Sequence, residues 1–253
     1  MRRRVGSCLQ SYLLIVVCSP LVAVYTSNAA EAPDNPALTT RVDFFSRYVW
    51  RGLAWSEGPV MQPSVGVSFG AFSATGWANV GMDRRDGSSL NEVDIILSYQ
   101  TASGNMAMET CLQFFTYPNS KNSPATGEAV VSVSYPVGPL RTYVSHASDF
   151  VHYRGSHYTE IGFCYTRDLG WNTSLEISLG VSAGSRKFND VYAGVAKSAW
   201  NVASLQVTLE HELSDGWGLS AQLSLSELLD SDLWGSGADR SLAVFGIGIV
   251  KTL

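Results

Sequence analysis

The chain ends in Phe245-Gly-Ile-Gly-Ile-Val-Lys-Thr-Leu253. Side chains alternate between the two faces of a strand, and every second residue from the end shares one face: Leu253, Lys251, Ile249, Ile247 and Phe245. A row of large apolar side chains on one face is expected of a strand that contacts lipid. The ending therefore predicts the last strand of a transmembrane β-barrel.

The same period-two alternation recurs upstream in segments of about ten residues, the length that a tilted strand needs to cross a bilayer. Clear apolar faces are formed by Val93, Ile95, Leu97 and Tyr99, by Leu175, Ile177, Leu179 and Val181, and by Leu205, Val207 and Leu209. A soluble β-sandwich also alternates, with its apolar faces turned inward. Aromatic residues near strand ends favour the barrel, because membrane barrels carry interfacial aromatic girdles. These residues are Tyr48, Trp50, Trp77, Tyr99, Tyr135 and Trp217.

The connections between the predicted strands alternate between short and long. Short breaks fall at 69–72, 101–105, 136–139, 167–172 and 214–216, and longer polar segments fall at 53–60, 83–90, 118–127, 150–157, 185–199 and 229–240. This alternation is typical of periplasmic turns and extracellular loops. It predicts an all-β, antiparallel up-and-down barrel of about 12 strands over residues 40–253, with both termini periplasmic. Residues 190–199 are open to reading as a further strand, but an odd strand count is unusual in bacteria, so we interpret them as loop.

Residues 1–30 predict a cleaved signal peptide, followed by a short periplasmic segment at 31–39. Arg2, Arg3 and Arg4 precede a broken apolar core, and small residues suited to cleavage lie at 27–30. A membrane anchor is the alternative, but Ser19-Pro20 interrupts the apolar stretch. Export together with a barrel predicts a place in the outer membrane, in contact with its lipid.

The composition of the mature chain excludes some partners. Three of the 17 Lys and Arg residues and none of the 22 Asp and Glu residues lie in the signal, so the mature chain carries 14 basic against 22 acidic residues, a formal charge of −8. Nucleic acid is therefore not an expected partner. Of the four cysteines, only Cys111 and Cys164 remain, and we expect both to be free thiols because several predicted strands separate them.

The segment Asp43-Phe-Phe-Ser-Arg-Tyr-Val-Trp-Arg-Gly-Leu53 resembles the opening Ser-x-Tyr-Val-x-Arg-Gly motif of the TorF-type porins. These are Gram-negative outer-membrane barrels of poorly defined function. The resemblance continues through Gly76-Trp-Ala-Asn-Val80, Glu92-Val-Asp94 and Tyr99, and ends at Val250-Lys-Thr-Leu253, where such barrels usually close in Lys-Thr-Phe. It implies that the barrel-assembly machinery reads the last strand, in which Leu253 replaces the usual aromatic residue.

The opening motif also predicts a charged lumen. If Phe44, Tyr48 and Trp50 face lipid, the alternation turns four charged side chains inward: Arg41, Asp43, Arg47 and Arg51. Buried arginines need partners, and seven carboxylates fall on faces that we also assign inward: Glu92, Asp94, Glu109, Glu128, Glu160, Glu176 and Glu210. These charges either form a structural ladder that fills the barrel or line a water-filled passage and set its ion preference.

No catalytic constellation emerges from the sequence. The four histidines are His146, His152, His157 and His211, and Ser156 beside His157 is the nearest approach to a nucleophile with its base. Solvated loop residues are the simpler interpretation of this pair. Neither zinc spacing nor a phosphate-binding glycine loop is present, and no metal or cofactor is expected. We therefore predict a porin-like channel for ions or small solutes rather than an enzyme. A non-conducting docking barrel is the alternative, and an outer-membrane lipid hydrolase is a third.

Overall fold

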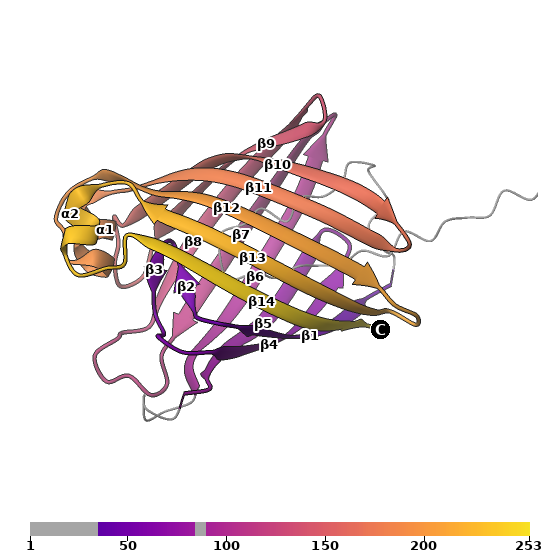
Figure 1. The fold of residues 1–253 in the computed structure, drawn as a ribbon, viewed down its shortest axis with the longest axis horizontal. Coiled ribbons are helices and arrows are strands. Elements are labelled where there is room, and N and C mark those ends of the chain that lie inside the picture. Colours follow the sequence, from indigo (N-terminus) through magenta and orange to yellow (C-terminus); the bar gives the residue numbers. More distant parts are fainter. Residues whose placement is uncertain (1–34, 84–89) are drawn as a thin grey trace, which may run out of the picture.

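Twelve long antiparallel strands close into a barrel in the computed structural model, which describes residues 35–83 and 90–253 (Figure 1). The predicted signal peptide lies outside these ranges. The barrel strands are β1 (Ala37–Phe45), β4 (Val60–Phe69), β5 (Phe72–Gly81), β6 (Leu90–Ser103), β7 (Met106–Thr116), β8 (Thr126–Val137), β9 (Leu140–Asp149), β10 (His157–Gly170), β11 (Thr173–Gly184), β12 (Ala199–Glu212), β13 (Trp217–Leu228) and β14 (Ser241–Thr252). Each pairs with its neighbours along the chain, and β1 pairs with β14 to close the sheet. The predicted fold class is confirmed, and β1 begins three residues before the predicted start of the barrel.

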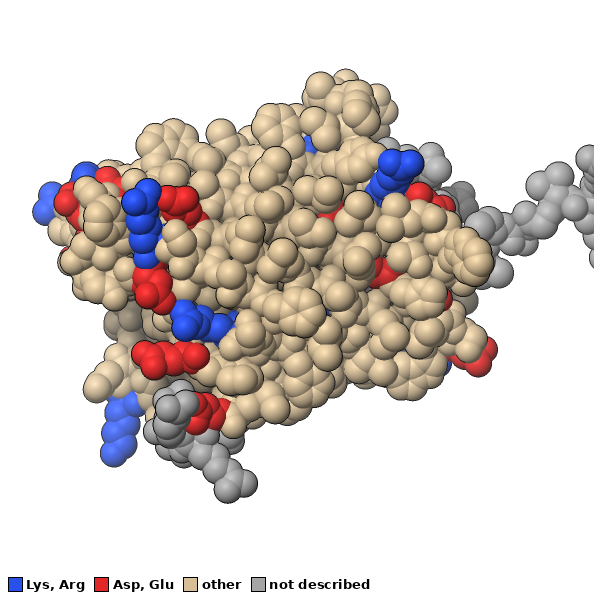
Figure 2. Space-filling view, viewed as in Figure 1, with Lys and Arg blue, Asp and Glu red and all other residues tan. Residues whose placement is uncertain are grey.

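The last strand has the predicted alternation. Phe245, Ile247 and Ile249 are exposed on the outer face, while Val244 and Val250 are buried. Directly paired residues share a face, and Phe245 pairs with Leu223 on β13, which is also exposed. The outer surface between the two ends of the barrel carries few charged residues, which gather at the ends on the face shown (Figure 2). This is the surface that a lipid-facing band requires.

The short and long connections lie at opposite ends of the barrel. We call them the short-turn end, where the chain terminus Leu253 also lies, and the long-loop end (Figure 1). Two helices, α1 (Arg186–Ala193) and α2 (Ser231–Gly235), sit together at the long-loop end. Neither is long and apolar enough to cross a membrane.

The ambiguous segment at residues 190–199 holds the end of α1 and the connection to β12. It is therefore not a strand of the sheet. Ser185 caps the start of α1 by accepting a hydrogen bond from the Phe188 amide, and Gly194 ends it in the left-handed conformation with a φ of 69°. The sequence interpretation as loop is right about the sheet, but it missed the helix.

The first strand is shorter than the opening motif suggested. It ends at Phe45, and residues 46–59, which we call the plug, turn into the barrel. The plug contains a small hairpin of β2 (Val49–Trp50) and β3 (Leu53–Ala54). Tyr48 and Trp50 lie inside the barrel, in one buried cluster with Val130 and Ala147 of its wall.

The lipid-facing assignment of Tyr48 and Trp50 is therefore wrong. Trp77, which we expected in an interfacial girdle, is also buried and lies in the same cluster. Alternation predicts a face only while a strand continues, and it ceases to apply where β1 ends. Tyr99, Tyr135 and Trp217, in contrast, are exposed on barrel strands.

Candidate functional site

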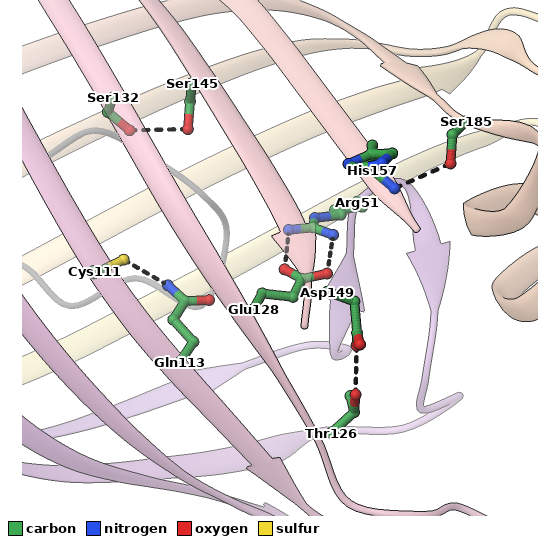
Figure 3. Close-up of polar contacts among 10 residues, drawn as sticks. All are labelled: Arg51, Cys111, Gln113, Thr126, Glu128, Ser132, Ser145, Asp149, His157 and Ser185. Atoms are coloured by element: carbon green, nitrogen blue, oxygen red, sulfur yellow. Dashed lines mark hydrogen bonds and ion pairs between the residues drawn. The ribbon is translucent and has the colours of Figure 1, made fainter. Parts of the chain in front are cut away.

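An ion pair between Arg51 and Glu128 fastens the plug to the barrel wall (Figure 3). Nη1 of Arg51 donates to Oε1 of Glu128 at 2.9 Å, and Nη2 donates to Oε2 at 2.6 Å. Both side chains are nearly inaccessible to solvent, with 1% and 2% of their surfaces exposed. Two parallel hydrogen bonds between planar groups give the contact a defined direction as well as charge attraction. The hairpin is thereby held to β8.

Aromatic rings enclose the guanidinium group of Arg51. Its Cζ lies 4.3 Å from the ring centroid of Trp50, 4.5 Å from that of Tyr158 and 5.3 Å from that of Phe188. Ring faces carry partial negative charge and attract a cation placed over them. Burial opposes the charge of Arg51, but the charge of Glu128 and its hydrogen bonds outweigh this and raise the pKa of Arg51. Arg51 is therefore a charged anchor in an aromatic environment.

Helix α1 supplies the other half of this aromatic cluster. Phe188 is fully buried, and its ring centroid lies 5.9 Å from that of Trp50 and 4.8 Å from that of Tyr158. The next residue, Asn189, is also fully buried and accepts a hydrogen bond at 2.6 Å from Nδ2 of Asn201 on β12. This hydrogen bond between two side-chain amides fixes the helix to β12, and the helix in turn holds Phe188 over the plug.

A polar cavity of about 100 Å³ lies beside the plug, against the inward faces of β11, β12 and β13. Its lining is rich in hydroxyl and amide side chains, namely Ser178, Ser182, Ser204, Gln206, Gln222, Ser224 and Ser226. Arg51 and Glu160 also border it. Because a water molecule needs roughly 10–15 Å³ of such volume, the cavity has room for several waters or one small polar solute.

The inward faces of the strands carry an excess of carboxylates. Arg41 pairs with Asp43 at 2.7 Å near the short-turn end and also donates to Ser220. With Arg51 and Glu128, this is the second arginine pair of the lumen. Within residues 35–83 and 90–253, the other predicted carboxylates have no ion pair: Glu92, Asp94, Glu109, Glu160, Glu176 and Glu210.

Neutral donors serve some of these carboxylates. The Tyr143 hydroxyl donates to Glu160 at 2.5 Å, and the Gln100 amide donates to Glu109 at 3.2 Å. Elsewhere, the inner wall carries hydroxyl and thiol contacts such as that between Ser132 and Ser145 (Figure 3). Cys111 and Cys164 are both free thiols. The wall therefore offers hydrogen-bonding groups and carboxyl groups.

Arg47 lies at the rim of the lumen rather than in its wall. Its side chain is 30% exposed and pairs at 2.9 Å with Asp239, which belongs to the long connection between β13 and β14. The predicted inward alternation fails here because Arg47 follows the end of β1. The side chain also borders the polar cavity, so it stands between that cavity and solvent.

The histidine and serine residues considered for catalysis are not joined. Ser156 is buried, whereas His157 is exposed and its ring stacks on that of His146, with 5.5 Å between the centroids. The backbone amide of His157 donates to Ser185 (Figure 3). Asp149, on the strand before this loop, accepts hydrogen bonds from the amides of Val151 and Tyr153 and organises the loop after β9. In the part of the chain that the structure describes, no group of acidic, histidine or cysteine residues is placed to hold a metal.

Several residues of the site were not found from the sequence. Phe188 and Tyr192 lie one helical turn apart on α1, and Asn201 lies at the start of β12. The 3.6-residue period of α1 covers only 8 residues, too short to stand out against the surrounding loop. The serine before it and the glycine after it are helix-capping residues, and these were the available signal.

Comparison with known proteins supports the fold and leaves the activity open. The profile of a family described as a bacterial protein of unknown function matches residues 29–221. No curated protein matches the chain significantly. Among solved structures, the NanC porin aligns with a TM-score of 0.54 at 12% identity, covering 85% of this chain and 100% of its own.

Two further solved structures are similar. The KdgM porin, in complex with a disordered oligogalacturonate, gives a TM-score of 0.53 at 9% identity, covering 85% of this chain and 98% of its own. An outer-membrane channel from Pseudomonas putida F1 gives 0.50 at 11% identity, covering 90% and 99%. At these identities the likeness concerns the fold, which is that of outer-membrane barrels.

Proposed function

We propose that this chain, which belongs to the Gcw_chp family of bacterial proteins of unknown function, is a porin-like channel of the outer membrane that favours small cations. The closed barrel and its likeness to porins and channels support the general class. The resemblance of its opening motif to the TorF-type porins agrees with this class and stays a prediction. The solute preference is argued from the lumen itself.

The observation that carries the proposal is the excess of carboxylates over arginines on the inner wall, with Arg141 counted beside Arg41 and Arg51. Asp43 and Glu128 are paired with arginine, but the six other predicted carboxylates named above have no such partner in the described ranges. Rings and rows of carboxylates favour cations in a water-filled pore. The KdgM porin was solved with an oligogalacturonate, which is a polyanion, and an acidic wall disfavours such a solute. A small cation or a neutral polar solute suits the Ser- and Gln-lined cavity better.

The plug sets the condition under which transport occurs. Trp50, Phe188 and Tyr158 fill the long-loop half of the barrel, and the polar cavity beside them is small. Passage of any solute therefore requires the plug to leave the lumen. Segments that move in this way are usually ordered in one state by a few specific contacts, and the Arg51–Glu128 pair is such a contact.

Planar-bilayer recordings in a salt gradient test the proposal. The wild-type barrel is expected to open rarely, and a variant with residues 47–56 replaced by a short Gly-Ser linker is expected to conduct steadily. The reversal potential of both is expected to show cation preference, and Glu176→Gln with Glu210→Gln should reduce it. A linker variant that does not conduct, or that prefers anions, would reject a cation channel.

The packing of the plug favours one alternative function. Arg51 and Glu128 are as buried as residues of a protein core, and a barrel filled in this way can serve as a non-conducting scaffold whose long loops bind a partner. The same recordings separate the two. A linker variant that conducts beside a wild-type barrel that never opens under any voltage or solute would favour the scaffold.

We also propose the orientation and assembly route of the barrel. Short turns face the periplasm in bacterial outer-membrane barrels, so the short-turn end and both termini are placed there and the long-loop end, with α1 and α2, faces the exterior. We propose that the barrel-assembly machinery recognises the exposed row of Phe245, Ile247 and Ile249 on β14. The orientation is tested by proteolysis, as described in the Discussion.

A further inference from the structure

A second, smaller cavity lies among aromatic residues of the plug, of β7 and the connection after it, and of α1. It measures about 20 Å³, and we call it the aromatic pocket. Its aromatic side chains are Tyr48, Trp50, Trp55, Phe115, Tyr117 and Tyr192. Trp55 is 48% exposed, so the pocket is reached from solvent at the plug. This pocket is separate from the polar cavity and has a different chemical character.

One carboxylate, that of Glu92 on β6, lines the aromatic pocket. Glu92 accepts hydrogen bonds from the hydroxyl groups of Tyr48 and Tyr117. These two bonds fix the carboxylate and use only part of its capacity, since an ionised carboxylate offers about four acceptor sites. The remaining acceptor positions have no cationic partner in the described parts of the chain.

A second acidic residue, Asp94, lies close to Glu92 but does not line the aromatic pocket. Asp94 follows Glu92 by two residues, so both project from the same face of β6, and Asp94 is 1% exposed. Among the residues described, its carboxylate has no side-chain partner, and the backbone amide of Thr116 is the one group directed at it. A buried carboxylate without a counter-charge is unfavourable unless it is neutralised or meets a cation. This pair of residues therefore points to a positively charged ligand.

The rings of the pocket suit the same kind of ligand. Trp50 and Tyr192 stand edge to face with centroids 5.0 Å apart, and Trp55 and Tyr192 lie 6.4 Å apart. Trp50 already holds one cation of the protein, the guanidinium of Arg51 at 4.3 Å. That charge is matched by Glu128 and does not line the aromatic pocket. Aromatic rings around a carboxylate form a recurrent cation-binding arrangement.

The size of the pocket restricts the cation. A water molecule needs roughly 10–15 Å³ of such volume, so about 20 Å³ admits a group of the size of a primary ammonium. A trimethylammonium group is several times larger. The acceptor positions that Glu92 has left can receive two of the three N–H donors of a primary ammonium, whereas a quaternary ammonium has no N–H donor.

We propose that the aromatic pocket binds the ammonium group of a primary amine, with Glu92 as its hydrogen-bonding counter-ion and the alkyl part of the ligand against Trp55. The site goes beyond the proposed channel, because it is complete in the plugged conformation. An amine bound there contacts both the plug and β6, and so stabilises the closed lumen. Binding therefore does not require an open pore.

Isothermal titration calorimetry on the refolded full-length protein in detergent micelles tests this site. The probe is n-butylammonium chloride, with tetramethylammonium chloride at the same ionic strength as the size control. We expect saturable binding of butylammonium and at least tenfold weaker binding of tetramethylammonium. Equal affinity for the two cations, or no saturable binding of butylammonium, overturns the proposal.

Two variants assign the binding to this pocket. Glu92→Gln removes the charge and is expected to weaken butylammonium binding on the order of tenfold, because a charge-assisted bond becomes a neutral one. Glu212→Gln, which changes an exposed carboxylate outside the pocket and outside the six lumen carboxylates, is expected to change it less than about twofold. If Glu92→Gln does not refold, judged by heat-dependent migration on a gel, Trp55→Leu replaces it, since Trp55 is half exposed. That change should weaken binding about two- to fivefold, and unchanged binding in either refolded variant overturns the proposal.

Discussion

Arg51 adopts a backbone conformation that non-glycine residues rarely use, with a φ of 51°. The left-handed region costs an L side chain roughly 1–2 kcal/mol. This cost is offset by a contact that a glycine cannot make, the two hydrogen bonds to Glu128. Breaking a buried ion pair by removing one partner typically costs about 3–5 kcal/mol. The cost of losing the ion pair exceeds the cost of the backbone strain, so Arg51 keeps this conformation.

Removing the guanidinium group should accordingly destabilise the protein. Arg51→Ala is expected to lower the free energy of unfolding by about 3–5 kcal/mol, because it leaves Glu128 charged and buried without a partner. Arg47→Ala serves as the control and should cost about 0–1 kcal/mol, since the pair of Arg47 with Asp239 is open to solvent. Denaturant unfolding in micelles, followed by tryptophan fluorescence, measures both. Similar losses in the two variants would mean that the Arg51 pair is not dry.

The lipid-facing surface also makes a prediction about single residues. Leu223 is exposed on the outer face of β13, and the adjacent Gln222 lines the polar cavity. Leu223→Arg should cost about 2–4 kcal/mol if it lies near the bilayer midplane, whereas Gln222→Arg should cost much less. Folding into lipid vesicles measures the difference. Equal costs would show that the exposed apolar face does not contact lipid.

Among the elements, the β2–β3 hairpin shows most clearly how local sequence and tertiary contacts combine. Its two central residues, Arg51 and Gly52, both have positive φ, at 51° and 78°. Two-residue hairpin loops favour this backbone, because its twist matches that of the flanking strands. The Arg-Gly dipeptide of the opening motif is therefore a turn inside the barrel, where the alternation had suggested a continuing strand.

Gly52 is required there for a second reason. A Cβ at this position would lie 2.5 Å from Cγ2 of Val202, which is itself buried against Leu228 and Leu233. Gly52→Ala should therefore displace the hairpin and cost more than about 1 kcal/mol. Stability and the exposure of Trp50, read by fluorescence quenching, measure the effect.

The matched control for this element is Gly235→Ala in α2. A Cβ on Gly235 meets no atom within 4 Å, and its φ is not positive. Alanine favours helix over glycine by up to about 1 kcal/mol, so this change should be neutral or slightly stabilising. A Gly52→Ala variant as stable as Gly235→Ala, with Trp50 still shielded, would contradict the close packing of the hairpin.

At the scale of the whole molecule, the two ends of the barrel differ in accessibility. Lys121 lies exposed in the connection between β7 and β8, whereas Arg186 begins α1 and Arg240 is paired with Glu227. Trypsin added to intact cells should therefore cut first at Lys121 and more slowly at the other two, with Lys251 protected at the short-turn end. Cleavage at Lys251 while Lys121 stays intact would reverse the proposed orientation.

The barrel itself follows from the sequence alone. Alternation is a local property, and each apolar row, such as Phe245, Ile247 and Ile249, must be covered whatever lies beyond it. Short turns make consecutive strands pair as antiparallel neighbours. The order of the strands around the barrel therefore follows their order in the sequence. Strand number, closure and the outward-facing residues within strands such as β14 could be predicted in this way.

The contents of the barrel were decided only in three dimensions. Tyr48 and Trp50 suit a lipid interface and a packed lumen equally well by their chemistry, and no alternation constrains them once β1 has ended at Phe45. Their place depends on Glu128, 77 residues from Arg51 in sequence, and on Phe188 of α1. These contacts depend on the closed sheet, which places β8 and the β11–β12 connection at the same end of the barrel. The alternation within a single strand therefore cannot predict these contacts.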